Sequence, residues 1–287
     1  MTDFNILGRP DGLGNRMEEI ILVSAFSSKE NQCFNYIWNN KFKNRRYDIN
    51  FTSENVKISK ESNKNIPIKT LNELELNLLT QDEILRSAKN INPTFKIHFE
   101  NEIKPIGVHI RGSDRINNND HPHFMKNKEE FFSYLEKAIE TINKKFPKYI
   151  FVCADDPRSR EIFIDNLNSD ITVINPVYDD SIKNEYVDFF SLSLCTEIYM
   201  CSKFSTFAIT ASMIGNIPLI AFQMDRDTAK RYKALFQYEL NIPHNDELYL
   251  SITENYPNKS PVSKRQYIEN RARRLLTQCK NAFYTNR

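Results

Sequence analysis

Short apolar strands alternate with amphipathic helices through the second half of the chain, and this pattern constrains the fold most. The apolar runs are IGVHI at 106–110, YIFVCA at 149–154, ITVI at 171–174, IYMC at 198–201 and IPLIAF at 217–222. Apolar residues at helical spacing predict helices over 128–146, 157–167, 185–195 and 206–214. Strands that are apolar on both faces are typical of a parallel sheet covered by helices on both sides. We therefore expect an α/β fold, with this series running from about residue 104 to 240.

The first hundred residues show a less regular pattern. A helix is predicted over 13–27, a short strand over 47–51, and a helix over 72–89 with a break near Thr80, which could cap its second half. We place a domain boundary near residue 104, which gives domains of residues 1–104 and 105–260 and a C-terminal helical segment of 261–287.

That last segment is a basic amphipathic helix over 263–283. Such helices can bind a membrane surface or a partner protein. We favour the alternative in which the helix packs on its own protein and exposes its basic face to water.

Composition excludes several classes of protein. The chain has 287 residues, 40% hydrophobic and 26% charged, which excludes a disordered or fibrous chain. No apolar stretch reaches the length of a transmembrane helix, and the start shows no signal-peptide pattern. The five cysteines form no C-x-x-C pair, so we expect thiols in a reducing cytoplasm. A net charge of +2 does not suggest nucleic-acid binding.

Polar residues follow the apolar strands, where parallel sheets bind ligands. Arg111 follows the strand at 106–110, and its guanidinium suits a phosphate or a carboxylate. The alternative is a structural pair of Arg111 with Asp114, beside a His109 that has its own partner.

Two further strands are followed by candidates. Asp155 and Asp156 could accept hydrogen bonds from a ligand's ring or hydroxyls, although an aspartate before a proline is also a common helix start. The hydroxyls of Ser205 and Thr206 open the helix at 206–214 and could form an anion site there, or could simply cap it.

The loop GRPDGLGN at residues 8–15 holds three of the six glycines in the chain. Glycines in a loop that leads into a helix allow close approach of the backbone to a ligand. The loop matches neither the dinucleotide fingerprint nor the P-loop, so it is a weak signal alone. His121 and His123 could bind a metal, but we expect no metal site.

Three stretches in fixed order carry a resemblance to the fucosyltransferase superfamily of GT-B glycosyltransferases. They are GLGNRMEEIILVSAF at 12–26, VHIRGSD at 108–114 and DFFSLSLCTEIYMCSKFSTFAITASMIGN at 188–216. The first resembles the family's G-x-G-N-Q loop and helix. The second matches H-x-R-x-x-D at its three fixed positions. The third has an acidic residue, a helix and S-x-F-S-x-F at the next helix start. The resemblance covers most of the chain and is weakest between residues 30 and 100.

This resemblance implies a GT-B-like fold, in which two Rossmann-like domains face each other across a cleft. Residues 1–104 would form the acceptor side and residues 105–260 would bind the nucleotide sugar, with 261–287 able to pack back on the N-terminal domain. The activity implied is inverting, metal-independent transfer of fucose from GDP-fucose to a glycan hydroxyl, with no cofactor. The partners would be a nucleotide sugar and a glycan acceptor, at the cytoplasmic face of a membrane.

The resemblance also assigns site residues. Arg111 would bind the β-phosphate, with His109 beside it. Ser205, Thr206 and Phe207 would hold the diphosphate. The remaining donor-side candidates are Gly12, Gly14, Asn15, Asp114, Asp155, Asp156 and Asp188, the last three for guanine or ribose. Asp11 and Glu18 are the candidates for the general base.

Two positions depart from the family pattern. Gly112 stands where many members carry a second arginine, and Arg16 stands where glutamine is usual. These departures leave two alternatives open: a transferase that uses another GDP-linked sugar, and a catalytically degenerate protein that only binds a nucleotide sugar.

Overall fold

The computed structural model describes residues 4–41, 47–62, 65–112, 128–202, 204–222, 236–238 and 245–255. Asp114, His121, His123 and the segment 261–287 lie outside the described residues. Among the described residues, no helix is long and apolar enough to span a membrane.

The alternating series forms a six-stranded sheet whose paired strands are all parallel, in the order β10-β9-β8-β12-β13-β14. Its strands are β8 (Ile106–Ile110), β9 (Tyr149–Ala154), β10 (Thr172–Val173), β12 (Ile198–Cys201), β13 (Leu219–Ala221) and β14 (Phe236–Tyr238). The predicted strands are thus confirmed, and β14 is an addition. Side chains of β8 and β9 are almost all buried, as the apolar runs indicated.

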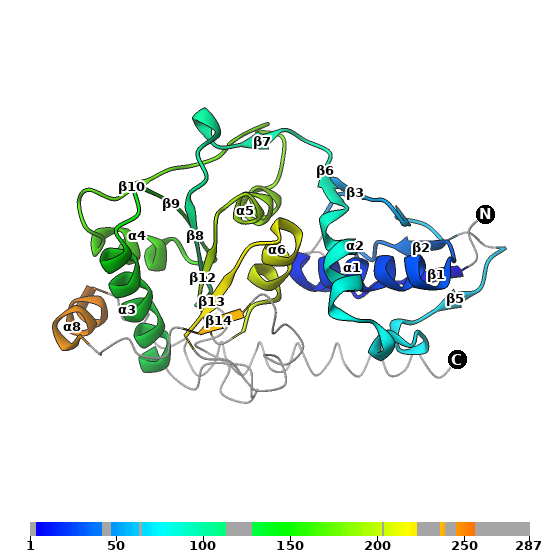
Figure 1. Cartoon of the computed structure of the whole chain (residues 1–287), viewed down its shortest axis with the longest axis horizontal. Coiled ribbons are helices and arrows are strands. Elements are labelled where there is room, and N and C mark those ends of the chain that lie inside the picture. The colour runs from blue at the N-terminus through cyan, green and yellow to red at the C-terminus, as the bar shows by residue number, and fades with distance from the viewer. Residues whose placement is uncertain are drawn as a thin grey trace, which may run out of the picture.

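Helices cover both faces of this sheet (Figure 1). They are α3 (Lys128–Lys145), α4 (Pro157–Asp165), α5 (Asn184–Ser193), α6 (Thr206–Gly215) and α8 (Asp246–Asn255). Apolar side chains of α3, α4 and α8 pack with Val108 and Ile110 on one face. Those of α5 and α6 pack with Cys153 and Met200 on the other, which is the face that His109 shares by register.

A second parallel sheet, of four strands in the order β4-β2-β1-β5, lies in the N-terminal part. It contains β1 (Phe4–Leu7), β2 (Phe34–Ile37), β4 (Val56–Ser59) and β5 (Ile68–Lys69), and it is accompanied by α1 (Leu13–Glu30) and α2 (Gln81–Lys89). Two parallel sheets with helices confirm the expected α/β class. The domain boundary near residue 104 stays a prediction.

The predicted strand at 47–51 is wrong for residues 47–50. The strand is β3 (Phe51–Ser53), which pairs antiparallel with β6 (Ile91–Pro93). Both backbone groups of Tyr47 are hydrogen-bonded to side chains. Trp38 Nε1 donates to the Tyr47 carbonyl at 2.8 Å, and the Tyr47 N–H donates to Asn40 Oδ1 at 3.2 Å. A strand ladder would need those same groups, so the chain does not extend there.

The helix predicted over 72–89 is correct only for its second half. Residues before α2 form the 3₁₀ turns η2 (Leu71–Glu73) and η3 (Leu76–Leu78). Thr80 caps α2 in a capping box with Glu83, as its position suggested. Thr70 makes the same arrangement with Glu73, so two separate starts divide the segment.

The remaining described elements are short. They are β7 (Ile97–His98), which pairs antiparallel with β11 (Val177–Tyr178), and the turn η4 (Glu100–Glu102). One hydrophobic cluster extends from Ile6 in the first sheet to Leu219 in the second, by way of α1, α5 and α6. In Figure 1, α1 and α2 accordingly lie against α6. This packing brings the starts of α1 and α6 together.

Candidate functional site

Three strands of the larger sheet end side by side. Ile110 pairs with Ala154 and with Cys201, so Arg111, Asp155 and Ser202 each follow directly after aligned strand ends. The N–H of Gly112 donates to the Asp155 carboxylate at 2.9 Å. The structure therefore brings the Arg111 and Asp155 segments together at the edge where parallel sheets bind ligands.

His109 and Phe207 are in contact. The imidazole is 6% exposed and stacks on the Phe207 ring, with centroids 5.2 Å apart and planes at 21°. Phe207 in turn meets the edge of Phe189 from α5, at 5.1 Å. His109, on β8, thus has an aromatic partner in the first turn of α6.

The first turn of α6 carries buried hydroxyls. Ser205 occupies the N-cap position, yet its side chain makes no capping hydrogen bond. Within the described part of the chain, the hydroxyls of Ser205 and Ser202 have no hydrogen-bond partner, and both residues are at most 1% exposed. Buried polar groups are normally paired. The hydroxyls of Ser202 and Ser205 lie beside the N-terminus of α6, where backbone N–H groups and the positive end of the helix dipole favour an anion.

The N-terminal loop meets this turn directly. Asn15 Oδ1 accepts a hydrogen bond from Thr206 Oγ1 at 2.5 Å. A Cβ on Gly14 would lie 2.5 Å from the backbone nitrogen of Phe207, so only glycine fits there. A Cβ on Gly12 would meet nothing within 4 Å, so nothing in the structure demands glycine at that position.

Three acidic candidates, Asp155, Asp156 and Asp188, lie near the end of β9. Asp156 is at the N-cap position of α4 and accepts from the Ser159 hydroxyl at 3.1 Å, so it does occupy a helix start. Asp188, on α5, is partly buried, and burial raises its pKa to about 6, helped by Glu185 and opposed by Arg160. The charges of Asp188 and Asp155 both contribute to raising the pKa of Cys153, which burial raises most. Asp155 and Asp188 therefore both lie close enough to Cys153, on β9, to act on its thiol.

The candidates for the general base are both held by neighbours. The Asp11 carboxylate accepts from the Gly12 N–H at 2.8 Å and from Asn15 Nδ2 at 2.5 Å. Glu18 lies 3.8 Å from a guanidinium nitrogen of Arg9. The role of either as a base stays a prediction.

Glu19 is a buried carboxylate that was not among the predicted site residues. This carboxylate is 1% exposed, is paired with Arg9 Nε, and accepts from the Tyr36 hydroxyl at 2.5 Å. Burial lowers the pKa of Arg9, but the charge of Glu19 opposes this effect, and the net result is a raised pKa. For Tyr36, burial and the charge of Glu19 both raise the pKa of the hydroxyl. Glu18 and Glu19 are both buried, and two adjacent glutamates in a helical pattern offered no signal of this.

The departure at Gly112 has a steric cause. A Cβ at this position would lie 2.7 Å from atoms of the Phe131 ring, on α3. Phe131 is fully buried. A side chain at position 112, such as the second arginine of the family pattern, would therefore meet this ring.

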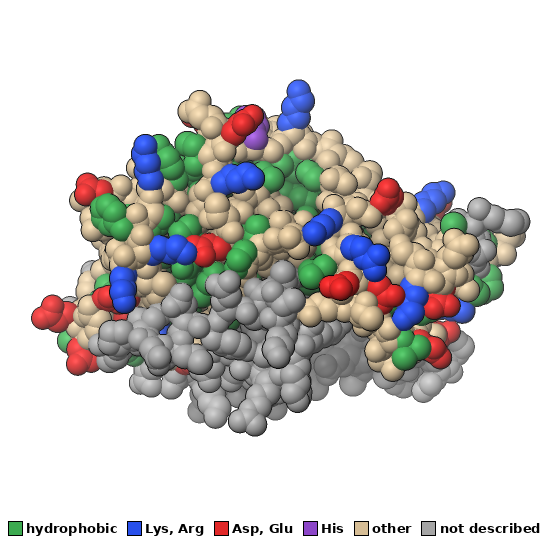
Figure 2. Space-filling model, in the orientation of Figure 1, with side chains coloured by type: hydrophobic (Ala, Val, Ile, Leu, Met, Phe, Trp, Pro, Cys, Tyr) green, Lys and Arg blue, Asp and Glu red, His purple; other side chains and the backbone are tan. Residues whose placement is uncertain are grey.

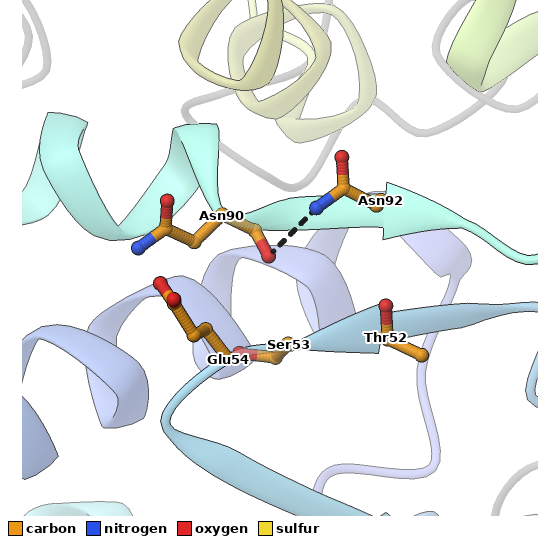
Figure 3. Close-up of a pocket in the computed structure, with 5 residues that line it drawn as sticks. All are labelled: Thr52, Ser53, Glu54, Asn90 and Asn92. Atoms are coloured by element: carbon orange, nitrogen blue, oxygen red, sulfur yellow. Dashed lines mark hydrogen bonds between the residues drawn. The ribbon is translucent and has the colours of Figure 1, made fainter.

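Two other features bear on ligands. Among the described residues, no group of three metal-ligating side chains occurs. A cavity of about 280 Å³ lies beside β3 and β6, and the residues that line it include none of the predicted site residues (Figure 3). It is lined by Thr52, Ser53, Glu54, Asn90 and Asn92.

The chain matches one known protein family over most of its length. The sequence profile of glycosyl transferase family 11 matches residues 5–241. No curated protein sequence matches the chain at a significant level.

Several solved structures resemble the chain at low identity. A NodZ alpha-1,6-fucosyltransferase soaked with GDP-fucose is 12% identical with a TM-score of 0.47, covering 77% of this chain and 95% of that one. The fucosyltransferase NodZ from Bradyrhizobium is 13% identical with a TM-score of 0.47, over 77% and 96% of the two chains. POFUT1 in complex with GDP is 12% identical with a TM-score of 0.49, over 78% and 99%.

Proposed function

The chain belongs to glycosyl transferase family 11, and we propose that it transfers fucose from GDP-fucose to a hydroxyl of a glycan acceptor, with inversion and without a metal ion. The family match confirms the resemblance to the fucosyltransferase superfamily and makes the protein a glycosyltransferase. The donor sugar, the acceptor and the stereochemistry are part of the proposal.

The first turn of α6 is the observation that carries this proposal. The hydroxyls of Ser202 and Ser205 are buried and have no partner within the described part of the chain. They follow β12, whose end pairs with the end of β8, and Arg111 comes next after β8. A diphosphate would supply acceptors for these hydroxyls and for the N–H groups of the helix, and a negative charge for Arg111.

The chemistry of sugar transfer needs such a group of donors. As the bond between the sugar and the nucleoside diphosphate breaks, negative charge grows on the leaving diphosphate. Fixed donors aimed at that charge stabilise the transition state more than the ground state. We assign this work to Arg111 and the start of α6. His109, stacked on Phe207, holds that turn against the strand.

An alternative donor is favoured by one observation. The ring of Phe131 fills the space beside Gly112, so the second arginine of many relatives has no equivalent at this position. One cation fewer near the donor is compatible with another GDP-linked sugar. A degenerate protein that binds nucleotide sugar without turnover is a further alternative, and turnover with any acceptor would exclude it.

The test is binding of GDP without added metal. We expect GDP to raise the melting temperature of the wild-type protein, and Arg111→Ala to abolish this shift. The control is Arg86→Ala, because Arg86 is exposed and donates only to the Asp82 carbonyl among the contacts described. Equal shifts with GDP, UDP and CDP would contradict the guanine assignment, and no shift with any of them would contradict the proposal.

Donor and location are tested separately. Turnover with a panel of sugar nucleotides identifies the sugar, and we expect GDP-fucose to be preferred.

We place the protein in the cytoplasm, at the inner face of a membrane, with a glycan acceptor. Fractionation of cells that express the chain should find it in the soluble and peripheral-membrane fractions; recovery outside the cell would contradict this location.

A further inference from the structure

Arg16 is a buried cation at a position where the family usually has glutamine. It is fully buried, and its guanidinium carbon lies 4.7 Å from the ring centroid of Trp38 and 5.2 Å from that of Tyr47. Its Nε donates to the Asp11 carbonyl at 2.8 Å, and a terminal nitrogen donates to Asn40 Oδ1 at 3.0 Å. Burial lowers the pKa of Arg16, but an arginine in a protein keeps its charge.

The first contact leads to the donor site. Arg16 holds the backbone of Asp11, and the Asp11 carboxylate accepts from the amide of Asn15. Asn15 then accepts from the hydroxyl of Thr206, the first residue of α6. Three consecutive hydrogen bonds thus connect Arg16 to the turn that carries Ser205.

The second set of contacts leads to α5, through the contact between Tyr47 and Tyr186. Tyr47, which covers one face of the Arg16 guanidinium, meets the edge of Tyr186 from α5 at 6.1 Å and 87°. The Tyr186 hydroxyl donates to the carbonyl of Asp48. Arg16 therefore touches the loop of the donor site and the aromatic contact between the N-terminal part and α5.

We infer that Arg16 is a positioning residue, which holds Asp11, Asn15 and Thr206 in the arrangement that binds the donor diphosphate. This inference rests on the proposed function. A planar guanidinium can lie between two rings while it donates in two directions, and a lysine ammonium or a glutamine amide cannot do both. The aromatic faces and the two oxygen acceptors offset the cost of burying its charge.

The experiment separates positioning from packing. Arg16→Met keeps an unbranched apolar chain in the space but removes the hydrogen bonds, and Arg16→Lys keeps the charge but loses the planar donor. We expect the Kd for GDP, measured by calorimetry on folded protein, to weaken roughly tenfold in Arg16→Met, the loss expected for one hydrogen bond to a charged group. Arg16→Lys should lie between this variant and wild type. Arg86→Met, on the exposed side of α2, is the matched control and should bind GDP like wild type.

A double variant tests the connection itself. Thr206→Val removes the hydroxyl that donates to Asn15, so adding Arg16→Met to it should weaken GDP binding little further. If the weakening of the Kd in the double variant is the product of the effects in the two single variants, the inference is overturned. An unchanged Kd together with a lowered melting temperature in either Arg16 variant would also overturn it. If Arg16→Met does not fold, Arg16→Lys gives the same decision. A wild-type protein that does not bind GDP would instead overturn the proposed function, and with it the ligand assigned here.

Discussion

Asn15, at the start of α1, accepts a hydrogen bond from the hydroxyl of Thr206, at the start of α6. The two residues are 191 positions apart in the chain, and they join α1, which follows β1 of the four-stranded sheet, to α6, which covers the six-stranded sheet. Among the described residues on the face in Figure 2, charged side chains of both signs are mixed, and they form no large patch of one charge that would mark a ligand site. The marks of the site are instead buried contacts at this junction.

The closeness of this junction predicts unequal effects at two glycines. Gly14→Ala would place a Cβ 2.5 Å from the Phe207 nitrogen, which belongs to the backbone and cannot rotate away. We expect a loss of about 1–3 kcal/mol in the free energy of unfolding, as for other overpacked sites. Gly12→Ala has nothing within 4 Å and a φ of −63°, so its stability should stay near that of wild type. Denaturant unfolding of both variants checks this; equal losses would contradict the predicted contact.

Gly112 provides a test of the family departure. Gly112→Ala would bring a Cβ to 2.7 Å from the Phe131 ring, and we expect a destabilisation of about 1–3 kcal/mol. Replacing the ring as well, in Gly112→Ala with Phe131→Leu, should cost less than the sum of the two single changes, because the smaller side chain gives the Cβ room. Denaturant unfolding of the three variants measures the interaction. Strict additivity would show that the ring does not exclude a side chain here.

The two sheets differ in how far the sequence reveals them. The strands of the larger sheet are buried on both faces and therefore appear as apolar runs. In the smaller sheet, β1 and β2 carry Asn5 and Asn35 at buried positions, and Asn35 Nδ2 donates to Asn5 Oδ1 at 2.8 Å. Hydrogen bonds with Ile66, Glu61 and Ser59 complete this buried pair, which looks, in the sequence, like two polar interruptions. The resemblance to a known family predicted this sheet, whereas the hydrophobic pattern did not.

The candidate site shows the same division. His109, Arg111 and Ser205 were predicted both from their places in or after apolar strands and from the family motifs. The contacts of Arg16 with Trp38 and of Gly112 with Phe131 depend on residues outside every motif, and on packing between segments far apart in the chain. Such contacts follow from the tertiary fold, so the sequence marked both positions only as departures.

Asp188 predicts a dependence of stability on pH. Burial raises its pKa to about 6 in the folded protein, against about 3.9 in an unfolded chain. Between about pH 3.9 and pH 6 the folded state binds more protons than the unfolded state. The contribution of Asp188 to the free energy of unfolding is therefore present at low pH, and it is lost as the pH rises through about 6. Asp188→Asn should therefore stabilise the protein by about 1–2 kcal/mol at pH 7.5, and by little at pH 4.

The same variant should weaken GDP binding if Asp188 accepts hydrogen bonds from guanine. Melting curves at pH 4, 6 and 7.5, with and without GDP, measure both effects. The control is Asp179→Asn, on an exposed loop, where hydrogen bonds from Ser181 lower the pKa of the carboxyl, so that removing the charge should not stabilise the protein at pH 7.5. A gain in stability for Asp188→Asn that is the same at all three pH values would contradict the raised pKa.

A comparison of two buried serines, Ser205 and Ser191, distinguishes a ligand-binding hydroxyl from one that is only part of the packed interior. Ser205 and Ser191 are both fully buried, and neither hydroxyl has a hydrogen-bond partner within the described part of the chain. Replacing such a hydroxyl by alanine removes an unsatisfied polar group, so each variant should melt at or above the temperature of the wild-type protein without ligand. Their effects on GDP should differ. Ser205 opens α6, whereas Ser191 accepts through its carbonyl from Cys195, which packs against Gly107 at the start of β8, far from its ligand-binding end.

We therefore expect Ser205→Ala to weaken the Kd for GDP by about fivefold to tenfold, the effect of one lost hydrogen bond to a charged oxygen, and Ser191→Ala to leave it unchanged. Calorimetric titration of both variants, at one salt concentration, makes the comparison. Equal affinities in the two variants would show that the hydroxyl of Ser205 does not face the diphosphate, and α6 would then contribute only its backbone N–H groups and its dipole.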